Sequence, residues 1–317
     1  MNLHAFIRGR FGLTLLLAAA ALPAAAYFRP VPADPLKAGR YEENLYYIHR
    51  THRTDTFDIA FVGDSRIQRG IDPQSVAGRL PGLHTVNLGY SNGSVDNEML
   101  DFAVQHMDPA GARILVLGIS SITFTQLTEG NAQLRQYLGA ARDEVWMARY
   151  APQLALFFQP VELVTVARAL ARRPYLPPAF YHQTFHDTGW MESDLKPRDE
   201  HRTDQGYRDS LSSSPYLPAR EAETIERITR LTAAGYRVFA LRVPIAKNLQ
   251  SIESQYSRFD WQAFRQRLAL AGGTWLEIPG APWTCYDGSH LAADEARRYS
   301  AAVGQTIAGY LSLGRNP

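Results

Sequence analysis

The sequence predicts an α/β protein in which helices cover both faces of a parallel sheet. Short apolar runs alternate with segments of helical periodicity, a pattern typical of βα units. Three of the apolar runs fall within 57–118, and this close spacing favours a three-layer sandwich. With 45% hydrophobic and 20% charged residues, the composition excludes disordered, collagen-like and coiled-coil chains.

Five short runs, rich in β-branched, aromatic and aliphatic residues, predict the buried strands: 58–62, 84–88, 113–117, 236–243 and 274–278. Segments with apolar residues at helical spacing predict the helices between and after them: 95–107, 220–235, 258–271 and 292–313. Strands that alternate with helices in this way imply a parallel sheet covered on both faces.

The alternation stops between 119 and 218. A connection of this length usually belongs to a lid or an inserted subdomain. Its first part, 131–173, has helical character, and 172–197 is rich in Pro, Tyr and His. We expect a mainly helical or irregular insertion within a domain that spans 57–317, preceded by a linker and leading helix over 28–56.

The segment 1–27 is a different kind of sequence. Residues 1–10 are basic without an acid, 11–27 form an uncharged apolar run, and the run ends in alanines; these are the three parts of a secretory signal. The run is also near the minimum length of a membrane-spanning helix. We expect a periplasmic or otherwise extracytoplasmic protein, anchored to the inner membrane through 11–27 or secreted after cleavage. The alternative is a buried core helix.

Charge and cysteine content exclude other classes. The 33 basic and 31 acidic residues give a net charge of +2 without a basic stripe, so nucleic acid is not an expected partner. The single cysteine, Cys285, excludes an intramolecular disulfide and a Cys-rich metal site. His182 and His186 stand four positions apart, with Asp187 and His201 beyond, but no HExxH glutamate accompanies them. We expect no metal and no other cofactor, and these histidines to contact substrate or lie at the surface.

The first strand ends in Gly63-Asp64-Ser65-Arg66. A serine at such a strand-to-helix corner lies at the carboxyl edge of the sheet, where open α/β sheets bind ligands. The helix start also offers free N–H groups to a developing oxyanion. An ordinary helix cap would equally explain Asp64 and Ser65. Arg66 and Arg69 are candidates for binding an anionic substrate; the alternative is a pair of solvated surface arginines.

Asp287 precedes His290 by three positions at the entry to the last predicted helix. A serine nucleophile needs a base, and that base needs an orienting carboxylate. Residues three apart at a helix entry lie one turn apart on the same side. The pattern therefore predicts a Ser65–His290–Asp287 triad. The alternative is a capping aspartate beside a surface histidine.

Three blocks resemble the SGNH (GDSL-type) esterase and acyltransferase superfamily: GDS at 63–65, NLGYSNGS at 87–94 and DGSHL at 287–291. The resemblance covers 57–118 and 219–313 and looks closest to exported alginate-acetylation-like and DltD-like envelope proteins. It implies a flavodoxin-like three-layer α/β/α sandwich (the SGNH fold), the Ser–His–Asp triad and ester chemistry without a metal.

The resemblance also implies an oxyanion hole built from the N–H groups of Ser65 and Asn92, with Gly93 replacing Asn92 if the loop shifts by one residue. The family's third block supplies an asparagine donor, but this chain reads Gly-Ile-Ser-Ser at 118–121. Ser120 is then the expected substitute. Because the loss of one donor costs about 10²–10³ in rate in other enzymes, a non-catalytic protein is an alternative.

These observations predict an exported serine enzyme that transfers or hydrolyses acyl esters, most simply acetyl esters, on a cell-envelope or secreted polysaccharide. Tyr181 and Trp190 of the insertion are candidates for stacking on sugar rings, and we expect the insertion to lie over the Ser65 edge. A membrane-bound acyltransferase that supplies the acyl group is an expected partner. The alternatives are a simple carboxylesterase, a scaffold that binds polymer or the acyltransferase, and an insertion that faces a membrane or partner.

Overall fold

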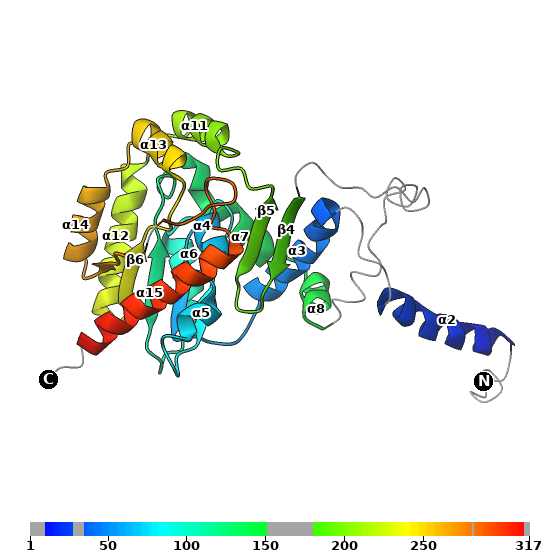
Figure 1. The fold of residues 1–317 in the computed structure, drawn as a ribbon. Helices are drawn as coiled ribbons and strands as arrows, with labels where there is room; N and C mark the ends of the chain where they lie inside the picture. The colour runs from blue at the N-terminus through cyan, green and yellow to red at the C-terminus, as the bar shows by residue number, and fades with distance from the viewer. Residues whose placement is uncertain (1–9, 28–34, 151–179, 281, 314–317) are drawn as a thin grey trace. The chain divides into compact units, whose positions relative to one another are not determined.

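The computed structural model describes residues 10–27, 35–150, 180–280 and 282–313 (Figure 1). These residues divide into two compact units, one drawn from 1–52 and 140–177, the other from 53–139 and 178–317. The ends of the expected insertion therefore belong to the second unit, and its middle belongs to the first.

The first unit contains three described helices: α2 (Arg10–Tyr27), α3 (Pro35–Thr51) and α8 (Arg142–Tyr150). Helix α2 covers the apolar run, α3 corresponds to the expected leading helix, and α3 packs against α8. The helix expected over 131–173 is found as far as Tyr150, and its continuation lies outside the described residues. Among the helices of the described ranges, none is both long and apolar enough to cross a membrane.

The second unit is built on a five-stranded parallel sheet. Its strands are β1 (Ile59–Val62), β2 (Thr85–Asn87), β3 (Ile114–Gly118), β6 (Arg237–Leu241) and β7 (Thr274–Trp275). All five overlap predicted strands, and their order in the sheet is β2-β1-β3-β6-β7 with every neighbouring pair parallel. The α/β class with a parallel sheet is confirmed, and the strand order is doubly wound, with β1 at the point where the order reverses.

The helices that flank the sheet form two groups. α4 (Ser65–Gly70) and α5 (Pro73–Ala77) pack against α15 (Ala293–Leu313), while α12 (Pro218–Ala233) packs against α6 (Asn97–Gln105) and α14 (Trp261–Leu270). Alternate residues of β1, β3 and β6 share one core with α4, α5 and α15. This arrangement is compatible with a three-layer α/β/α fold.

The apolar core stabilises the second unit without a disulfide. Phe61, Val116 and Leu241 project from neighbouring strands into the core, where Ile67 of α4 and Val303 of α15 meet them. Each such side chain contributes about 1.5–3 kcal/mol when it is buried. Cys285 lies in the same core as a free thiol.

Part of the insertion differs from the expectation. The Pro-, Tyr- and His-rich stretch contains an antiparallel hairpin, β4 (Phe180–Phe185) and β5 (Met191–Lys196), instead of irregular structure. Along β5, Met191, Ser193 and Leu195 are buried while the residues between them are more exposed. This period of two indicates a half-buried strand, whereas the Pro-rich composition had suggested a loop. The elements η1 (Gln126–Asn131), α7 (Ala132–Leu138), α11 (Asp204–Ser213) and α13 (Lys247–Tyr256) complete the unit.

Candidate active site

Ser65 begins helix α4 directly after β1, as the sequence predicts. Asp64 is the N-cap of this helix, and its side chain accepts the N–H of Arg66 at 2.9 Å. Gly63 has φ 151°, and a Cβ at this position would come within 2.9 Å of the Gly118 carbonyl oxygen. The capping role is therefore filled by Asp64, and the adjacent Ser65 hydroxyl is left for another function.

The triad predicted from the sequence comes together at the carboxyl end of β1. Nε2 of His290 lies 2.9 Å from Oγ of Ser65, and Nδ1 of His290 lies 2.8 Å from Oδ2 of Asp287. The other carboxylate oxygen of Asp287 accepts the N–H groups of Ser289 at 3.0 Å and His290 at 2.9 Å. The carboxylate is thus fixed by its own loop and favours the tautomer with hydrogen on Nδ1, which leaves Nε2 to accept the serine proton.

The surroundings of the triad favour a neutral imidazole beside a charged carboxylate. Burial lowers the pKa of His290, the charge of Arg69 lowers it further, and Asp287 opposes both. Burial raises the pKa of Asp287, but the charge and hydrogen bonds of His290 outweigh it, and the net shift is downward. Nη1 of Arg69 lies 3.1 Å from Nε2 and 3.3 Å from Nδ1 of His290. These are the protonation states that a general base and its orienting group require.

Two backbone N–H groups are available to an oxyanion. Ser65 is the first residue of α4, and Asn92 has the left-handed φ of 52°. Both residues line one cavity with His290. Within the described residues, neither N–H donates to an acceptor of the chain. Ser65 and Asn92 therefore remain the candidate oxyanion donors.

The expected roles of Gly93 and Ser120 are wrong. The N–H of Gly93 donates to the carbonyl of Tyr90 at 2.9 Å and closes a turn. The hydroxyl of Ser120 donates to Oδ2 of Asp64 at 2.6 Å, and the residue is only 2% exposed. Both groups already donate hydrogen bonds within the protein, so neither is available to an oxyanion.

Arg66 does not face a substrate, which corrects its predicted role. It is 2% exposed, its Nη2 forms an ion pair at 2.5 Å with Oε1 of Glu253, and its Nε donates to Oγ of Ser289 at 3.3 Å. Arg66 therefore links α4 to α13 and to the loop that carries His290. A single sequence gives no signal for this, because Glu253 lies 187 positions away.

The prediction that Trp190 stacks on a sugar is also wrong. Trp190 is 2% exposed, its Nε1 donates to the carbonyl of Arg69 at 2.8 Å, and its ring stacks on His186 at 4.8 Å. Its face is thus covered by the chain itself. Through its hydrogen bond to Arg69, Trp190 holds the C-terminal part of α4.

Tyr181 likewise lies outside the cavity wall. Its hydroxyl accepts from Gln183 at 3.0 Å and lies 3.5 Å from the hydroxyl of Tyr286. The ring of Tyr286 stacks on the imidazole of His290 at 5.7 Å. Tyr181 therefore contributes to the packing behind the triad instead of to a sugar-binding face.

A cavity of about 470 Å³ contains the Ser65 hydroxyl and is called the Ser65 cavity below. Its wall comprises Ser65, Arg69, Ser91, Asn92, Ile122, Leu127, Arg202, Thr203, Gly206, Tyr207, Ser210 and His290. More than half of these residues belong to 119–218. The insertion thus lies over the Ser65 edge as expected, but through 122–127 and 202–210 and not through the aromatic stretch. Sequence reasoning missed α11 because its residues are mostly polar.

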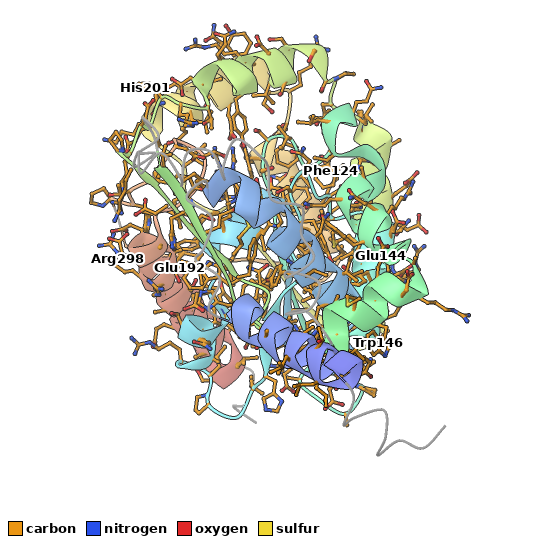
Figure 2. The ribbon with its side chains drawn as sticks, turned by 90° about the vertical axis from the view of Figure 1, so that its right-hand side faces the viewer. Phe124, Glu144, Trp146, Glu192, His201 and Arg298 are labelled. Atoms are coloured by element: carbon orange, nitrogen blue, oxygen red, sulfur yellow. The ribbon has the colours of Figure 1, made fainter. Side chains whose placement is uncertain are left out.

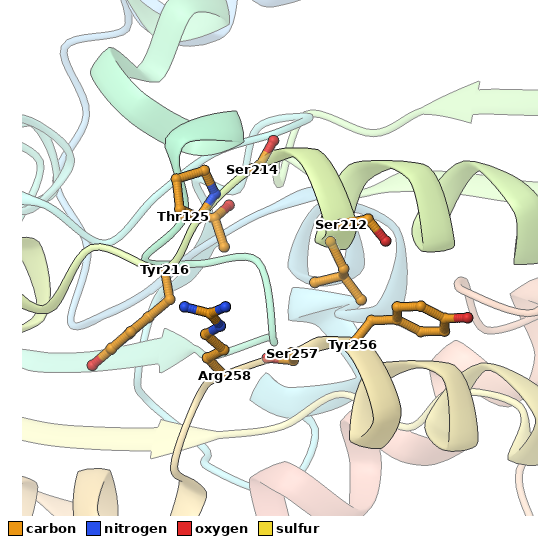
Figure 3. A pocket seen from close by; sticks show the side chains of 9 residues that line it. Thr125, Ser212, Ser214, Tyr216, Tyr256, Ser257 and Arg258 are labelled. Atoms are coloured by element: carbon orange, nitrogen blue, oxygen red, sulfur yellow. The ribbon is translucent and has the colours of Figure 1, made fainter.

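A second cavity of about 210 Å³ lies beside the C-terminal ends of α11 and α13 (Figure 3). Its wall comprises Thr125, Leu211, Ser212, Ser214, Pro215, Tyr216, Tyr256, Ser257 and Arg258. None of the residues predicted to form a site is among them.

The histidines outside the triad have partners of their own. His186 lies 2.9 Å from Oε2 of Glu192 on β5, and His201 lies 2.9 Å from Oδ2 of Asp204. Figure 2 shows Glu192 and His201 well apart. Within the described ranges, no three His, Cys, Asp or Glu residues are grouped so that they could hold a metal ion.

No family model, no curated protein and no solved structure matches the chain. The fold and the geometry of the site therefore carry the functional argument.

Proposed function

We propose that this protein is an SGNH-type serine esterase or O-acyltransferase with a flavodoxin-like three-layer fold. The observation that carries the proposal is the hydrogen-bonded chain from Ser65 through His290 to Asp287, with spacings of 2.9 and 2.8 Å. Its position supports the same conclusion, because the serine stands at the carboxyl edge of a doubly wound sheet and opens into a cavity.

The geometry suits a two-step acyl transfer. Ser65 Oγ attacks the ester carbonyl while Nε2 of His290 takes its proton, and the negative carbonyl oxygen accepts the N–H groups of Ser65 and Asn92. His290 then gives the proton to the departing alkoxide, which leaves an acyl group on Ser65. In the second step His290 deprotonates water or a sugar hydroxyl, which attacks the acyl-serine. The bond to Ser65 Oγ breaks, His290 returns the proton to Oγ, and an acid or a new ester is released.

The cavity supports a substrate larger than an acetyl group. A volume of about 470 Å³ lies within the usual range for sites that bind drug-sized molecules, about 300–1,000 Å³. The Ser210 hydroxyl and the Arg202 guanidinium on its wall suit a carbohydrate. We propose an acyl ester, most simply acetyl, on an envelope or secreted polysaccharide, with a membrane-bound acyltransferase as the source of the acyl group.

A non-catalytic scaffold is the second candidate, and one observation favours it. The hydroxyl of Ser120, expected to replace the missing asparagine donor, is bound to Asp64. The oxyanion then has the two backbone donors alone, and a slow or inactive site is the consequence.

Formation of acetyl-Ser65 distinguishes the serine enzyme from the non-catalytic scaffold. The full chain is incubated with 4-nitrophenyl acetate and, separately, with an acetyl donor and candidate polysaccharides, and acetate release and polymer acetylation are measured. Ser65→Ala should abolish both activities, whereas Ser213→Ala, which alters an exposed serine of α11 outside the cavity wall, should retain them. Absence of any acetyl-Ser65 in the wild type would overturn the enzymatic proposal and leave the scaffold.

Export is proposed from the sequence of 1–27. Reporter fusions after residue 60 should be active with a reporter that folds only outside the cytoplasm and silent with one that works only inside it. The reverse pattern would refute export.

A further inference from the structure

The turn that presents Asn92 has a backbone conformation that glycine adopts more easily. The N–H of Gly93 donates to the carbonyl of Tyr90, and Asn92 occupies the third position of this turn with φ 52°. A positive φ at that position favours glycine, with asparagine next. For an L-residue the left-handed region costs roughly 1–2 kcal/mol, less for asparagine. The orientation of the Asn92 N–H therefore depends on what holds the turn.

Two side chains from the insertion hold this turn on both sides of Asn92. Oε1 of Gln133 accepts the N–H of Ser91 at 2.7 Å, and Oδ1 of Asn131 accepts the N–H of Ser94 at 2.7 Å. The two acceptors stand at the start of α7, and neither uses the N–H of Asn92 itself.

The Asn131 side chain is rigidly placed. It is 1% exposed, and its Nδ2 donates to Oδ1 of Asp96 at 2.6 Å. Asp96 is the N-cap of α6, where the same oxygen accepts the N–H of Met99. The acceptor for Ser94 is therefore anchored to a helix that packs on the sheet.

The opposite side of the turn rests on the strand-to-helix corner that carries the nucleophile. The carbonyl of Gly63 accepts the N–H of Tyr90 at 3.0 Å, and a Cβ at Gly93 would lie 2.5 Å from that oxygen. The turn is thus bound on one side to the backbone of the Gly63 corner and on the other to Gln133 and Asn131.

We propose that Gln133 and Asn131 are positioning residues of the oxyanion hole: they hold the 90–94 turn in the conformation that presents the N–H of Asn92 to the oxyanion. The inference rests on the proposed function at Ser65. It matters most in this protein because Ser120 donates to Asp64 and the hole depends on two backbone donors. A misdirected Asn92 N–H would leave one.

The test compares a single variant, a double variant and a control variant of the full chain. Gln133→Met keeps the size of the side chain but removes the acceptor, and we expect kcat for 4-nitrophenyl acetate to fall about tenfold with KM within twofold. The fall is smaller than the 10²–10³ for a deleted donor because the N–H remains present. Adding Asn92→Gly should recover at least threefold of that loss, because glycine adopts a positive φ without a steric cost.

Gln136→Met is the matched control, because Gln136 is an exposed glutamine of the same helix; its kcat should stay within twofold of the wild type. An unchanged kcat in Gln133→Met, or no recovery on adding Asn92→Gly, would overturn the positioning role. A recovery of kcat would distinguish a positioning role from general destabilisation, because Asn92→Gly restores no hydrogen bond. If the wild type neither hydrolyses the ester nor forms acetyl-Ser65, the proposed function itself is overturned. The ratios of kcat between variants do not report on that outcome.

Discussion

The hydroxyl of Tyr207 lies 2.6 Å from Oγ of Ser289, the residue that immediately precedes His290. Tyr207 belongs to α11 and also lines the Ser65 cavity. Thr203, the residue before this helix, donates its hydroxyl to the carbonyl of Asp287 at 2.8 Å. The segment that forms one wall of the cavity therefore also binds the loop that carries the histidine and aspartate of the triad.

Tyr207→Phe should lower kcat for ester hydrolysis by about two- to tenfold. The ring and its packing remain, and only the hydrogen bond to Ser289 is lost. Such a bond contributes a net of about 0.5–1.5 kcal/mol. The loss falls on kcat because the bond holds the His290 loop. Tyr256→Phe is the control, since Tyr256 is partly exposed and lines the other cavity. Equal kcat values for the two variants would contradict the coupling.

A serine-directed phosphonate should label Ser65 and no other serine. Among the serines that the structure describes, only Ser65 has a hydrogen bond to a histidine that is itself bound to a carboxylate. Ser91 lies in the same cavity, but its hydroxyl donates to Oε1 of Gln68. Mass spectrometry of the labelled peptide decides the outcome, and His290→Ala should remove nearly all labelling because an unassisted serine hydroxyl is a poor nucleophile. Labelling at Ser91 or Ser289 would refute the triad.

The sheet and the triad were predictable because local patterns determine them. Each strand is a short apolar run, and Ser65 stands where the first of them meets a helix. Asp287 and His290 lie close in sequence, so their mutual geometry needs no long-range information. The parallel order then brings Ser65 and the entry to α15 together, because ligand sites of open α/β sheets form at the carboxyl edge.

The roles of Arg66, Trp190 and Ser120 were not predictable from the sequence. Whether a polar or aromatic side chain faces solvent or core depends on partners far along the chain, such as Glu253 for Arg66 and the Arg69 carbonyl for Trp190. A side chain of a suitable type in a plausible place is unavailable to a ligand when it is buried and paired within the protein.

Breaking the buried pair between Arg66 and Glu253 should destabilise the second unit strongly. Burial raises the pKa of Glu253, but the charges of Arg66 and Arg242 outweigh it and the net shift is downward, so the carboxylate is charged. Glu253→Gln leaves the Arg66 guanidinium buried without its counter-ion, which typically costs about 3–5 kcal/mol. Urea unfolding of the full chain measures the change in the free energy of unfolding.

Glu226→Gln provides the comparison for that measurement. Glu226 pairs with Arg230 on the exposed face of α12, with side chains 69% and 51% exposed. Exposed pairs of this kind contribute about 0.3–0.5 kcal/mol. If the two variants lost equal stability, the buried pair would not be the structural link between α4 and α13.

The activity should persist to lower pH than an ordinary histidine base allows. Catalysis needs neutral His290, and burial together with the charge of Arg69 lowers its pKa below the ordinary value of 6.5. The acid limb of kcat/KM therefore lies below pH 6.5, with activity rising as pH increases through the lowered pKa and level across the neutral range. A pH profile of ester hydrolysis measures the limb.

Arg69→Gln reverses part of this shift. Removing a positive charge 3.1 Å from Nε2 makes protonation of His290 easier, so its pKa rises and the acid limb moves to higher pH. At a fixed acidic pH the variant then has more imidazolium and less activity relative to its own plateau. Arg208→Gln alters an exposed arginine of α11 outside the cavity wall and should leave the limb in place. If the acid limb of Arg69→Gln is unchanged or moves to lower pH, Arg69 does not control the protonation of His290.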